Sequence, residues 1–239
     1  MGRLRLMQPS DLKVLVGCET SGIVRQAFNA LGFNAWSCDI LPSDDQTNKH
    51  IQDDIRNALK MDNWDLICIM HPPCTRLCNS GVKWLHELAP SAAAEGKTLK
   101  DIWNDLEEGC KLFADCWNAD APCIAVENPI MHYHAKDRIE KYSNRPFPRK
   151  ANQIIHPWHF ATDDHQDDNQ KKQTCFWLHN LPALERTGTL DGSTARDDVH
   201  KAAPSADRWK IRSKFFPKVA EQMAAQWGLA ALQKKGSNK

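Results

Sequence analysis

The chain has 239 residues, enough for one medium α/β domain with a full core, so we expect a single domain over residues 1–233 and a disordered tail over 234–239. Lysine and arginine number 31 against 30 aspartate and glutamate, for a net charge of +1, which excludes a global positive field as the means of binding nucleic acid. The nine cysteines lack the regular spacing of a disulfide framework, so we expect reduced thiols. The chain has no apolar signal segment and no apolar run long enough to span a membrane, so we expect a soluble, cytoplasmic protein.

The first predicted elements form a strand, a glycine-containing turn and a helix. Residues 13–18, KVLVGC, are an apolar strand, and the apolar spacing over 23–31 predicts a helix that Gly32 ends. Such a turn lets a ligand approach the backbone and the helix N-terminus, as in nucleotide-binding folds. The full glycine fingerprint is missing, so the turn taken alone favours a tight turn with a serine or threonine cap.

Acidic residues follow the next predicted strand. Asp39 ends the strand over 34–38, about twenty residues after the turn, where α/β folds bind ribose hydroxyls. A helix or turn cap explains the same position equally well. Asp53 and Asp54 come after a further apolar residue, and either hold a cofactor base or face solvent.

A cysteine follows two prolines at the end of the most apolar strand. Residues 64–70, WDLICIM, form the continuous apolar run that is typical of a strand buried on both faces of a parallel sheet. Pro72 and Pro73 lack amide donors, so they stop the strand and leave Cys74 at the carboxyl edge of the sheet, where open α/β folds place ligands. The loop-like segment 81–98 is either a flap over Cys74 or an ordinary surface loop.

A carboxylate reaches the same edge from the next predicted strand. An apolar stripe over 99–117 predicts a core-facing helix, and residues 122–126, PCIAV, form a buried strand. Glu127, Asn128 and a proline follow that strand directly. Because the carboxyl ends of parallel strands meet at one edge, we expect Glu127 to lie close to Cys74.

The second half of the chain carries a basic segment and an acidic one. Between residues 135 and 150 lysine and arginine outnumber carboxylates and alternate with Tyr142 and Phe147, which suits phosphate contact and base stacking or, alternatively, a solvated loop. We expect the acidic run 163–168 to be an exposed insertion, 173–179 a late strand, and Pro217 the start of a last helix. The basic residues singled out for nucleic-acid contact are Arg138, Lys141, Arg145, Arg149 and Lys150.

Five short motifs occur in one order: VLVGCETSG, CDI, QDDI, HPPCTRLCNSG and VENP. In order and spacing they resemble the C5-cytosine DNA methyltransferases, especially small phage-type members, over about residues 13–180. The resemblance implies a class-I methyltransferase fold, which is Rossmann-like: a mostly parallel, twisted sheet with helices on both faces. It also implies S-adenosylmethionine as cofactor, DNA as partner and no metal.

The resemblance assigns a role to residues of each motif. Cys74 matches the nucleophile, Glu127 and Asn128 match a Glu-Asn pair, and Lys172 matches a position that carries arginine in the family. Ser80 joins the nucleic-acid-binding residues. The cofactor-binding positions are Gly17, Cys18, Glu19, Ser21, Gly22, Asp39 for the ribose, Ile40, Asp54 near the adenine, and Pro72.

The residue types suit cytosine methylation. A thiolate adds at C6, because C5 alone is a poor nucleophile, and the resulting enamine takes a methyl group from a sulfonium. Glu127 would hydrogen-bond to N3 or protonate it, and Asn128 would position Glu127. The nucleotide has to be flipped out of a duplex, and 81–98 is the segment expected to close over it.

Two positions depart from the family, and one segment is short. Thr75 and Thr174 stand where the family has glutamine and arginine, so residue 174 supplies no guanidinium to a flipped base. About 35 residues separate the late strand from the last helix, too few for the usual target-recognition domain. We therefore expect short or relaxed sequence specificity.

Three alternatives stay open. The first is the same chemistry on RNA, single-stranded DNA or a pyrimidine nucleotide, and the second is a catalytically silent relative that binds nucleic acid. The third is a metal site built from His71, Cys74 and Cys78 with His132 and His134, although it lacks the paired C-x-x-C spacing of structural zinc sites.

Overall fold

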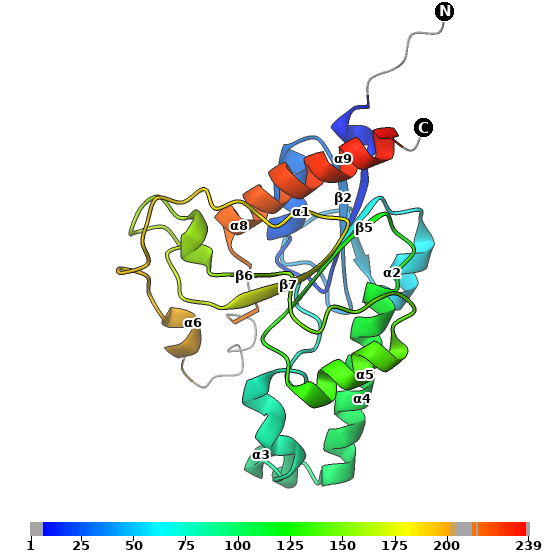
Figure 1. The fold of residues 1–239 in the computed structure, drawn as a ribbon, viewed down its shortest axis with the longest axis vertical. Helices are drawn as coiled ribbons and strands as arrows, with labels where there is room; N and C mark the ends of the chain where they lie inside the picture. The colour runs from blue at the N-terminus through cyan, green and yellow to red at the C-terminus, as the bar shows by residue number, and fades with distance from the viewer. Residues whose placement is uncertain (1–6, 202, 204–211, 214, 238–239) are drawn as a thin grey trace, which may run out of the picture.

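The described part of the chain forms a seven-stranded sheet with helices on both faces (Figure 1). The computed structural model describes residues 7–201, 203, 212–213 and 215–237. The strand order is β3-β2-β1-β4-β5-β7-β6, and neighbours run parallel except at β7, which is antiparallel to β5 and β6. The strands are β1 Lys13–Gly17, β2 Asn34–Asp39, β3 His50–Gln52, β4 Leu66–Ile69, β5 Cys123–Asn128, β6 Gln153–Ile155 and β7 Thr174–His179.

The central strands are apolar on both sides, and this is why they lie inside the sheet. Every residue of β4 and β5 is buried, and β1 is buried from Val14 onward. A strand between two layers of helices has no side that faces solvent, so its sequence is continuously apolar rather than alternating.

The helices form two layers with separate cores. On one face α1, α8, the π-helical segment η4 and α9 bury Phe28, Met223 and Trp227. On the other face α2, α4 and α5 bury Ile102 and Ile139. None of the described helices combines the length and apolar character that crossing a bilayer requires. The helices are α1 Ile23–Ala30, α2 Ile55–Met61, α3 Pro90–Ala94, α4 Leu99–Trp117, α5 Tyr133–Tyr142, α6 Asp198–Lys201, α8 Pro217–Gln222, η4 Met223–Trp227 and α9 Gly228–Ser237, and the 3-10 helices are η1 Pro9–Asp11, η2 Asn79–Leu85 and η3 Pro157–Phe160.

Most predicted elements are confirmed, with small shifts at their ends. The helix over 99–117 has the predicted bounds, because Thr98 caps its first turn and an apolar stripe faces the sheet. Strand β5 is longer than predicted and includes Glu127 and Asn128. The sequence pattern does not reveal β3, α2, α5 or β6, because each is short and carries a weak periodic signal.

Three irregular segments differ from expectation. Segment 81–98 holds most of η2 and the short helix α3 rather than a plain loop. The tail expected from residue 234 is helical as far as Ser237, where Lys235 Nζ donates to Asp65 Oδ2 at 2.6 Å, and residues 238–239 lie outside the described residues. The acidic run 163–168 is not wholly exposed, since Asp168 is buried beneath the start of α8.

Asp168 is expected to make the stability of the fold depend on pH. Its Oδ1 accepts from the backbone amides of Lys218 at 2.9 Å and Val219 at 3.2 Å, while burial raises the pKa of Asp168 to about 6. The folded state therefore binds the Asp168 proton more tightly than the unfolded state does. The resulting stabilisation of the fold is complete below about pH 4 and is lost as the pH rises through about 6.

Replacing Asp168 with asparagine keeps an oxygen for both amides and removes the buried charge. The Asp168→Asn variant should be about 2 kcal/mol more stable than wild type at pH 7.5 and closely similar near pH 4, measured by urea unfolding at both values. A stability difference that stays constant between the two pH values would contradict this assignment.

Candidate functional site

Two neighbouring parallel strands end side by side and deliver the predicted reactive groups. β4 pairs with β5 up to Ile69, which lies opposite Val126. The chain then leaves β4 through two prolines to Cys74, whereas β5 continues to Glu127. The prolines act as predicted, because they end the ladder at the carboxyl edge of the sheet.

Hydrogen bonds between the two exit loops fix the loop that carries Cys74. The carbonyl of Cys74 accepts from the amide of Leu77 at 2.9 Å, which closes a turn. The following residues are tied to the segment after β5: the amide of Asn79 donates to Ile130 at 2.8 Å, and the amide of His132 donates to Leu77 at 3.1 Å. The loops after β4 and β5 therefore form one connected unit.

A thiol, a carboxyl group and an amine share this site. Cys74 is half-buried, and Glu127 is buried. Burial raises the pKa of Cys74 to about 12, and the charge of the neighbouring Glu127 acts in the same direction. Burial also lowers the pKa of Lys172, against the attraction of Glu127 and Cys74, and its Nζ donates to the Arg212 carbonyl at 2.9 Å. Three of the predicted catalytic residues are thus brought together.

Asn128, the other predicted catalytic residue, has a different environment. It is fully buried, and its Nδ2 donates to the carbonyl of Pro129 at 2.7 Å. Side chains alternate along a strand, so Asn128 continues the row of Ile124 and Val126, and Glu127 belongs to the opposite row. Among the described residues no hydrogen bond joins the Asn128 side chain to Glu127, and Asn128 instead holds the turn that leaves β5.

His71 completes the group, although the sequence pattern marks it only as a candidate metal ligand. Its Nδ1 lies 3.6 Å from Oε2 of Glu127, and its ring centroid lies 5.7 Å from that of Phe215. Burial lowers the pKa of His71, against the attraction of Glu127, so the ring is neutral at pH 7. Its position between the apolar strand and the two prolines is the signal that could have identified it.

The turn after β1 is built around a buried carboxylate. Glu19 is 2% exposed and accepts from the amide of Val24 at 2.8 Å and the hydroxyl of Ser21 at 3.1 Å. Glu19 therefore caps the first turn of α1 together with Ser21, a serine as the sequence predicts, whose hydroxyl accepts from the amide of Ile23 at 3.4 Å. Gly22 has a φ of +69°, so the local geometry favours glycine there, whereas a Cβ at Gly17 would lie 2.5 Å from Cδ1 of Ile55 and would require that side chain to move.

The acidic residues after β2 and β3 lie at the same edge of the sheet. Asp39 accepts from the amide two residues on at 3.0 Å, and Ile40 beside it is 71% exposed. The amide of Asp53 donates to the Asp39 carbonyl at 3.0 Å. Asp54 caps α2 by accepting from the amide of Arg56 at 2.8 Å, and so has a structural role. The other predicted cofactor residues are Cys18, half-buried with a φ of 57°, and the buried Pro72.

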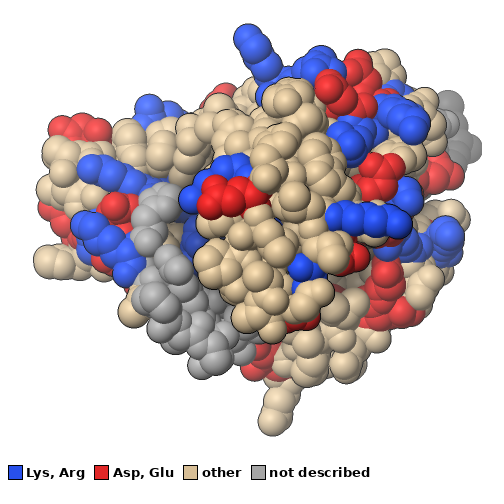
Figure 2. All heavy atoms as spheres, turned by 90° about the horizontal axis from the view of Figure 1, so that it is seen from below, with Lys and Arg blue, Asp and Glu red and all other residues tan. Residues whose placement is uncertain are grey.

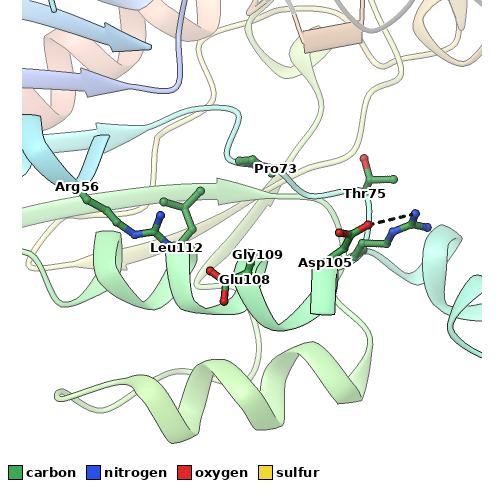
Figure 3. A pocket seen from close by; sticks show the side chains of 8 residues that line it. Arg56, Pro73, Thr75, Asp105, Glu108, Gly109 and Leu112 are labelled. Carbon is green, nitrogen blue, oxygen red and sulfur yellow. Dashed lines mark ion pairs between the residues drawn. The ribbon is translucent and has the colours of Figure 1, made fainter. Parts of the chain in front are cut away.

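A cavity of about 400 Å³ adjoins the Cys74 loop and α4 (Figure 3). Pro73 and Thr75, on either side of Cys74, line it together with Arg56, which pairs with Asp54 at 3.5 Å. The cavity therefore lies beside the Cys74 loop and the start of α2, but neither Cys74 nor Asp54 lines it. Sequence reasoning missed it because its walls come from separate segments. The remaining lining residues are Arg76, Asp105, Glu108, Gly109 and Leu112.

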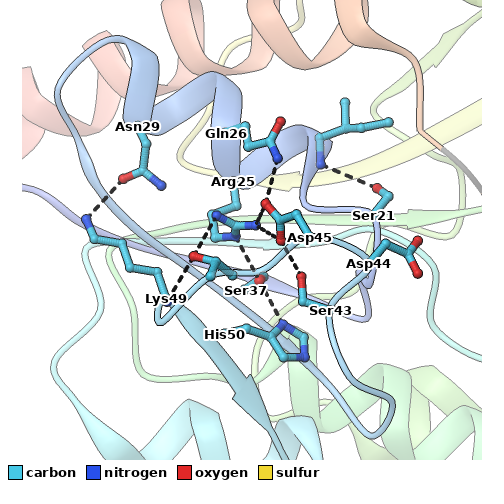
Figure 4. Close-up of polar contacts among 12 residues, drawn as sticks. Ser21, Arg25, Gln26, Asn29, Ser37, Ser43, Asp44, Asp45, Lys49 and His50 are labelled. Carbon is cyan, nitrogen blue, oxygen red and sulfur yellow. Dashed lines mark hydrogen bonds and ion pairs between the residues drawn. The ribbon is translucent and has the colours of Figure 1, made fainter.

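A polar network holds the segment after Asp39 against α1 (Figure 4). Arg25 is 4% exposed and donates to both carboxylate oxygens of Asp45 at 2.6 Å and to Ser37 at 3.0 Å. Burial opposes ionisation of Asp45, but hydrogen bonds from Ser43 and Arg25 lower its pKa to about 2. The network fixes the chain beyond Asp39 relative to α1 and the turn after β1.

Carboxylates neutralise much of the predicted basic segment. Arg138 pairs with Glu107 at 3.0 Å, and Arg149 pairs with Asp137 at 2.6 Å and with Glu140. On the face that Figure 2 shows, lysine and arginine are interspersed with aspartate and glutamate. These contacts favour the solvated, ion-paired interpretation of the segment. Of the other predicted nucleic-acid residues, Arg145 donates to the Ala119 carbonyl, and Lys141, Lys150 and Ser80 are exposed.

The fold and the site define an α/β protein in which a thiol, a carboxyl group, an amine and an imidazole meet at the carboxyl edge of a mostly parallel sheet. Within the described ranges no cluster of three or more side chains is arranged to hold a metal ion. The sequence matches no protein-family model and no curated protein. Its function therefore has to be inferred from the site itself.

Proposed function

We propose that the protein transfers a methyl group from S-adenosylmethionine to C5 of cytosine in DNA, through a covalent adduct with Cys74. The observation that carries the proposal is that adjacent parallel strands deliver Cys74 and Glu127 to one edge of the sheet, near enough for the charge of Glu127 to raise the pKa of Cys74. Such a pair supplies a nucleophile for C6 and a proton-holding group for N3 of the same ring. The mostly parallel sheet is compatible with a class-I methyltransferase fold.

The turn after β1 suits a cationic cofactor better than a phosphate. In dinucleotide-binding folds the helix N-terminus binds a pyrophosphate, but here the Glu19 carboxyl group accepts from the amides of Val24 and Arg25. A phosphate would meet that carboxyl group, whereas the sulfonium and ammonium of S-adenosylmethionine are compatible with it. Asp39 and Ile40 would hold the nucleoside, and the cofactor would supply an electrophilic methyl group.

Cys74 and Glu127 are coupled through their charges. Because the charge of Glu127 raises the pKa of Cys74, a proton taken up by Glu127 lowers that pKa again. With a base bound, the proton of the Cys74 thiol would pass to Glu127, which would share it with N3 as sulfur adds to C6. After methyl transfer, a water molecule would take the C5 proton, N3 would return its proton to Glu127, and cleavage of the C6–S bond would restore the aromatic ring and release the thiolate.

Lys172 is expected to assist ionisation of the thiol. Its charge lowers the pKa of Cys74, against the larger effects of burial and Glu127. Replacing Lys172 with methionine should slow alkylation of Cys74 by iodoacetamide at pH 8 by about 2- to 3-fold, measured by mass spectrometry of the Cys74 peptide. Lys171→Met changes the exposed neighbour and should leave the rate unchanged. Equal rates in Lys172→Met and wild type would show that Lys172 does not act on the thiol.

Trapping with 5-fluorocytosine tests the proposed function. Protein incubated with labelled S-adenosylmethionine and duplex DNA containing 5-fluorocytosine should form a labelled covalent complex. The adduct persists because C5 carries fluorine in place of the proton whose removal would release the enzyme. Parallel reactions with single-stranded DNA and RNA identify the substrate, and a complex with RNA alone would transfer the proposal to RNA. Absence of both adduct and methyl transfer, with nucleic-acid binding retained, would favour the catalytically silent alternative.

A further inference from the structure

The imidazole of His71 has one nitrogen toward Glu127 and another with no protein partner in the described structure. Nδ1 lies 3.6 Å from Oε2 of Glu127. Nε2 is buried and has no hydrogen-bond partner among the described residues. A buried polar atom without a partner costs free energy, and at a site this cost is recovered when a ligand supplies the partner. His71 is therefore arranged to contact a ligand beside Glu127.

The charge state of the ring assigns a role to each nitrogen. Burial lowers the pKa of His71, so the ring is neutral at pH 7 and carries one N–H donor and one acceptor. The carboxyl oxygen on the Nδ1 side favours the proton on Nδ1. Nε2 is then an acceptor, and it requires a donor from the ligand.

We propose that His71 makes the site specific for cytosine over uracil by accepting a hydrogen bond from the 4-amino group through Nε2, an inference that rests on the proposed methyl transfer. Cytosine presents an acceptor at N3 with an amino group beside it, whereas uracil presents a donor at N3 and a carbonyl oxygen at position 4. An acceptor at Nε2 matches the 4-amino group of cytosine and opposes the carbonyl oxygen at position 4 of uracil, and the proton that the proposed reaction places between Glu127 and N3 requires the acceptor that cytosine has at N3. A site that leaves buried polar groups unpaired discriminates strongly against the wrong ligand.

Two substitutions at position 71 test the roles of Nδ1 and Nε2 separately. In the His71→Asn variant the side-chain amide lies near the position of Nδ1, and no atom replaces Nε2. In the His71→Gln variant the side-chain amide lies near the position of Nε2 and can turn either its oxygen or its nitrogen toward the base. Methyl transfer is measured as kcat/KM on DNA duplexes that carry cytosine or uracil opposite an abasic site, which equalises the cost of flipping. His165→Asn changes an exposed histidine and is the matched control.

Wild type and His165→Asn should prefer cytosine by at least about 100-fold. His71→Asn should lose about 10- to 100-fold on cytosine and little on uracil, and His71→Gln should keep most activity on cytosine and gain activity on uracil. An unchanged cytosine-to-uracil ratio in both variants, or a wild type without preference, overturns the inference and leaves the methyltransferase proposal standing. A wild type that methylates neither base overturns both. Thermal unfolding of each variant identifies any loss of fold.

Discussion

Replacing Cys74 with serine is expected to reduce methyl transfer by about a thousandfold or more and to abolish the covalent complex with 5-fluorocytosine. A serine hydroxyl is far harder to ionise than a thiol and is a weaker nucleophile toward C6. The measurements are transfer of labelled methyl groups to duplex DNA and recovery of the denaturation-stable complex. The effect is large because the adduct with Cys74 precedes every later step.

Cys78→Ser is the matched control for Cys74→Ser. Cys78 lies in the same loop, is also half-buried, and has its Sγ 3.1 Å from Ser80 Oγ, a contact that serine can reproduce. The control variant should methylate and trap DNA at close to the wild-type rate. Comparable methylation by Cys74→Ser and Cys78→Ser would remove Cys74 from the reaction and with it the covalent mechanism.

Replacing Glu127 with glutamine is expected to change methyl transfer and thiol reactivity in opposite directions. Glutamine cannot pass a proton to N3, so methyl transfer should fall by about 10²- to 10⁴-fold. Glu127 raises the pKa of Cys74 through its charge, so removing the charge lowers that pKa. Alkylation of Cys74 by iodoacetamide should therefore be faster than in wild type by at least about threefold at pH 8.

Opposite changes distinguish a proton-holding role from damage to the site. A distorted site would lower methyl transfer without a specific gain in the reactivity of Cys74, and such a result would refute the coupling of the two groups. Glu87→Gln is a suitable control, because Glu87 is an exposed carboxylate beyond the Cys74 loop. Circular dichroism confirms that each variant is folded before the rates are compared.

The correct sequence predictions concern features whose physical signal is local. Thr98 and the apolar stripe behind it define α4, because a cap and a periodicity are properties of a single segment. The juxtaposition of Cys74 and Glu127 is predictable for a similar reason. Cys74 follows one continuously apolar strand, and Glu127 lies near the end of another, with prolines just beyond each strand, and the carboxyl ends of parallel strands meet at one edge.

The features that sequence reasoning missed depend on partners far along the chain. The sequence around Arg138 predicts a cation available for phosphate contact, but Arg138 pairs with Glu107, which lies 31 residues earlier on α4. The cap of α1 includes the buried Glu19 beside the expected serine, Ser21, because the tight turn brings that carboxyl group back onto the helix. Neither contact follows from composition or periodicity.

The amino-acid pattern is sufficient to identify the buried strands and the prolines that stop them, and therefore the residues that reach the carboxyl edge of the sheet. Which of those side chains face one another depends on how strands and loops pack in three dimensions. That packing brings His71 against Glu127 and directs Asn128 to the opposite row. Apolar burial and backbone hydrogen bonding are encoded within a segment, whereas the charge and hydrogen-bond environment of a side chain depends on the neighbours that packing brings to it.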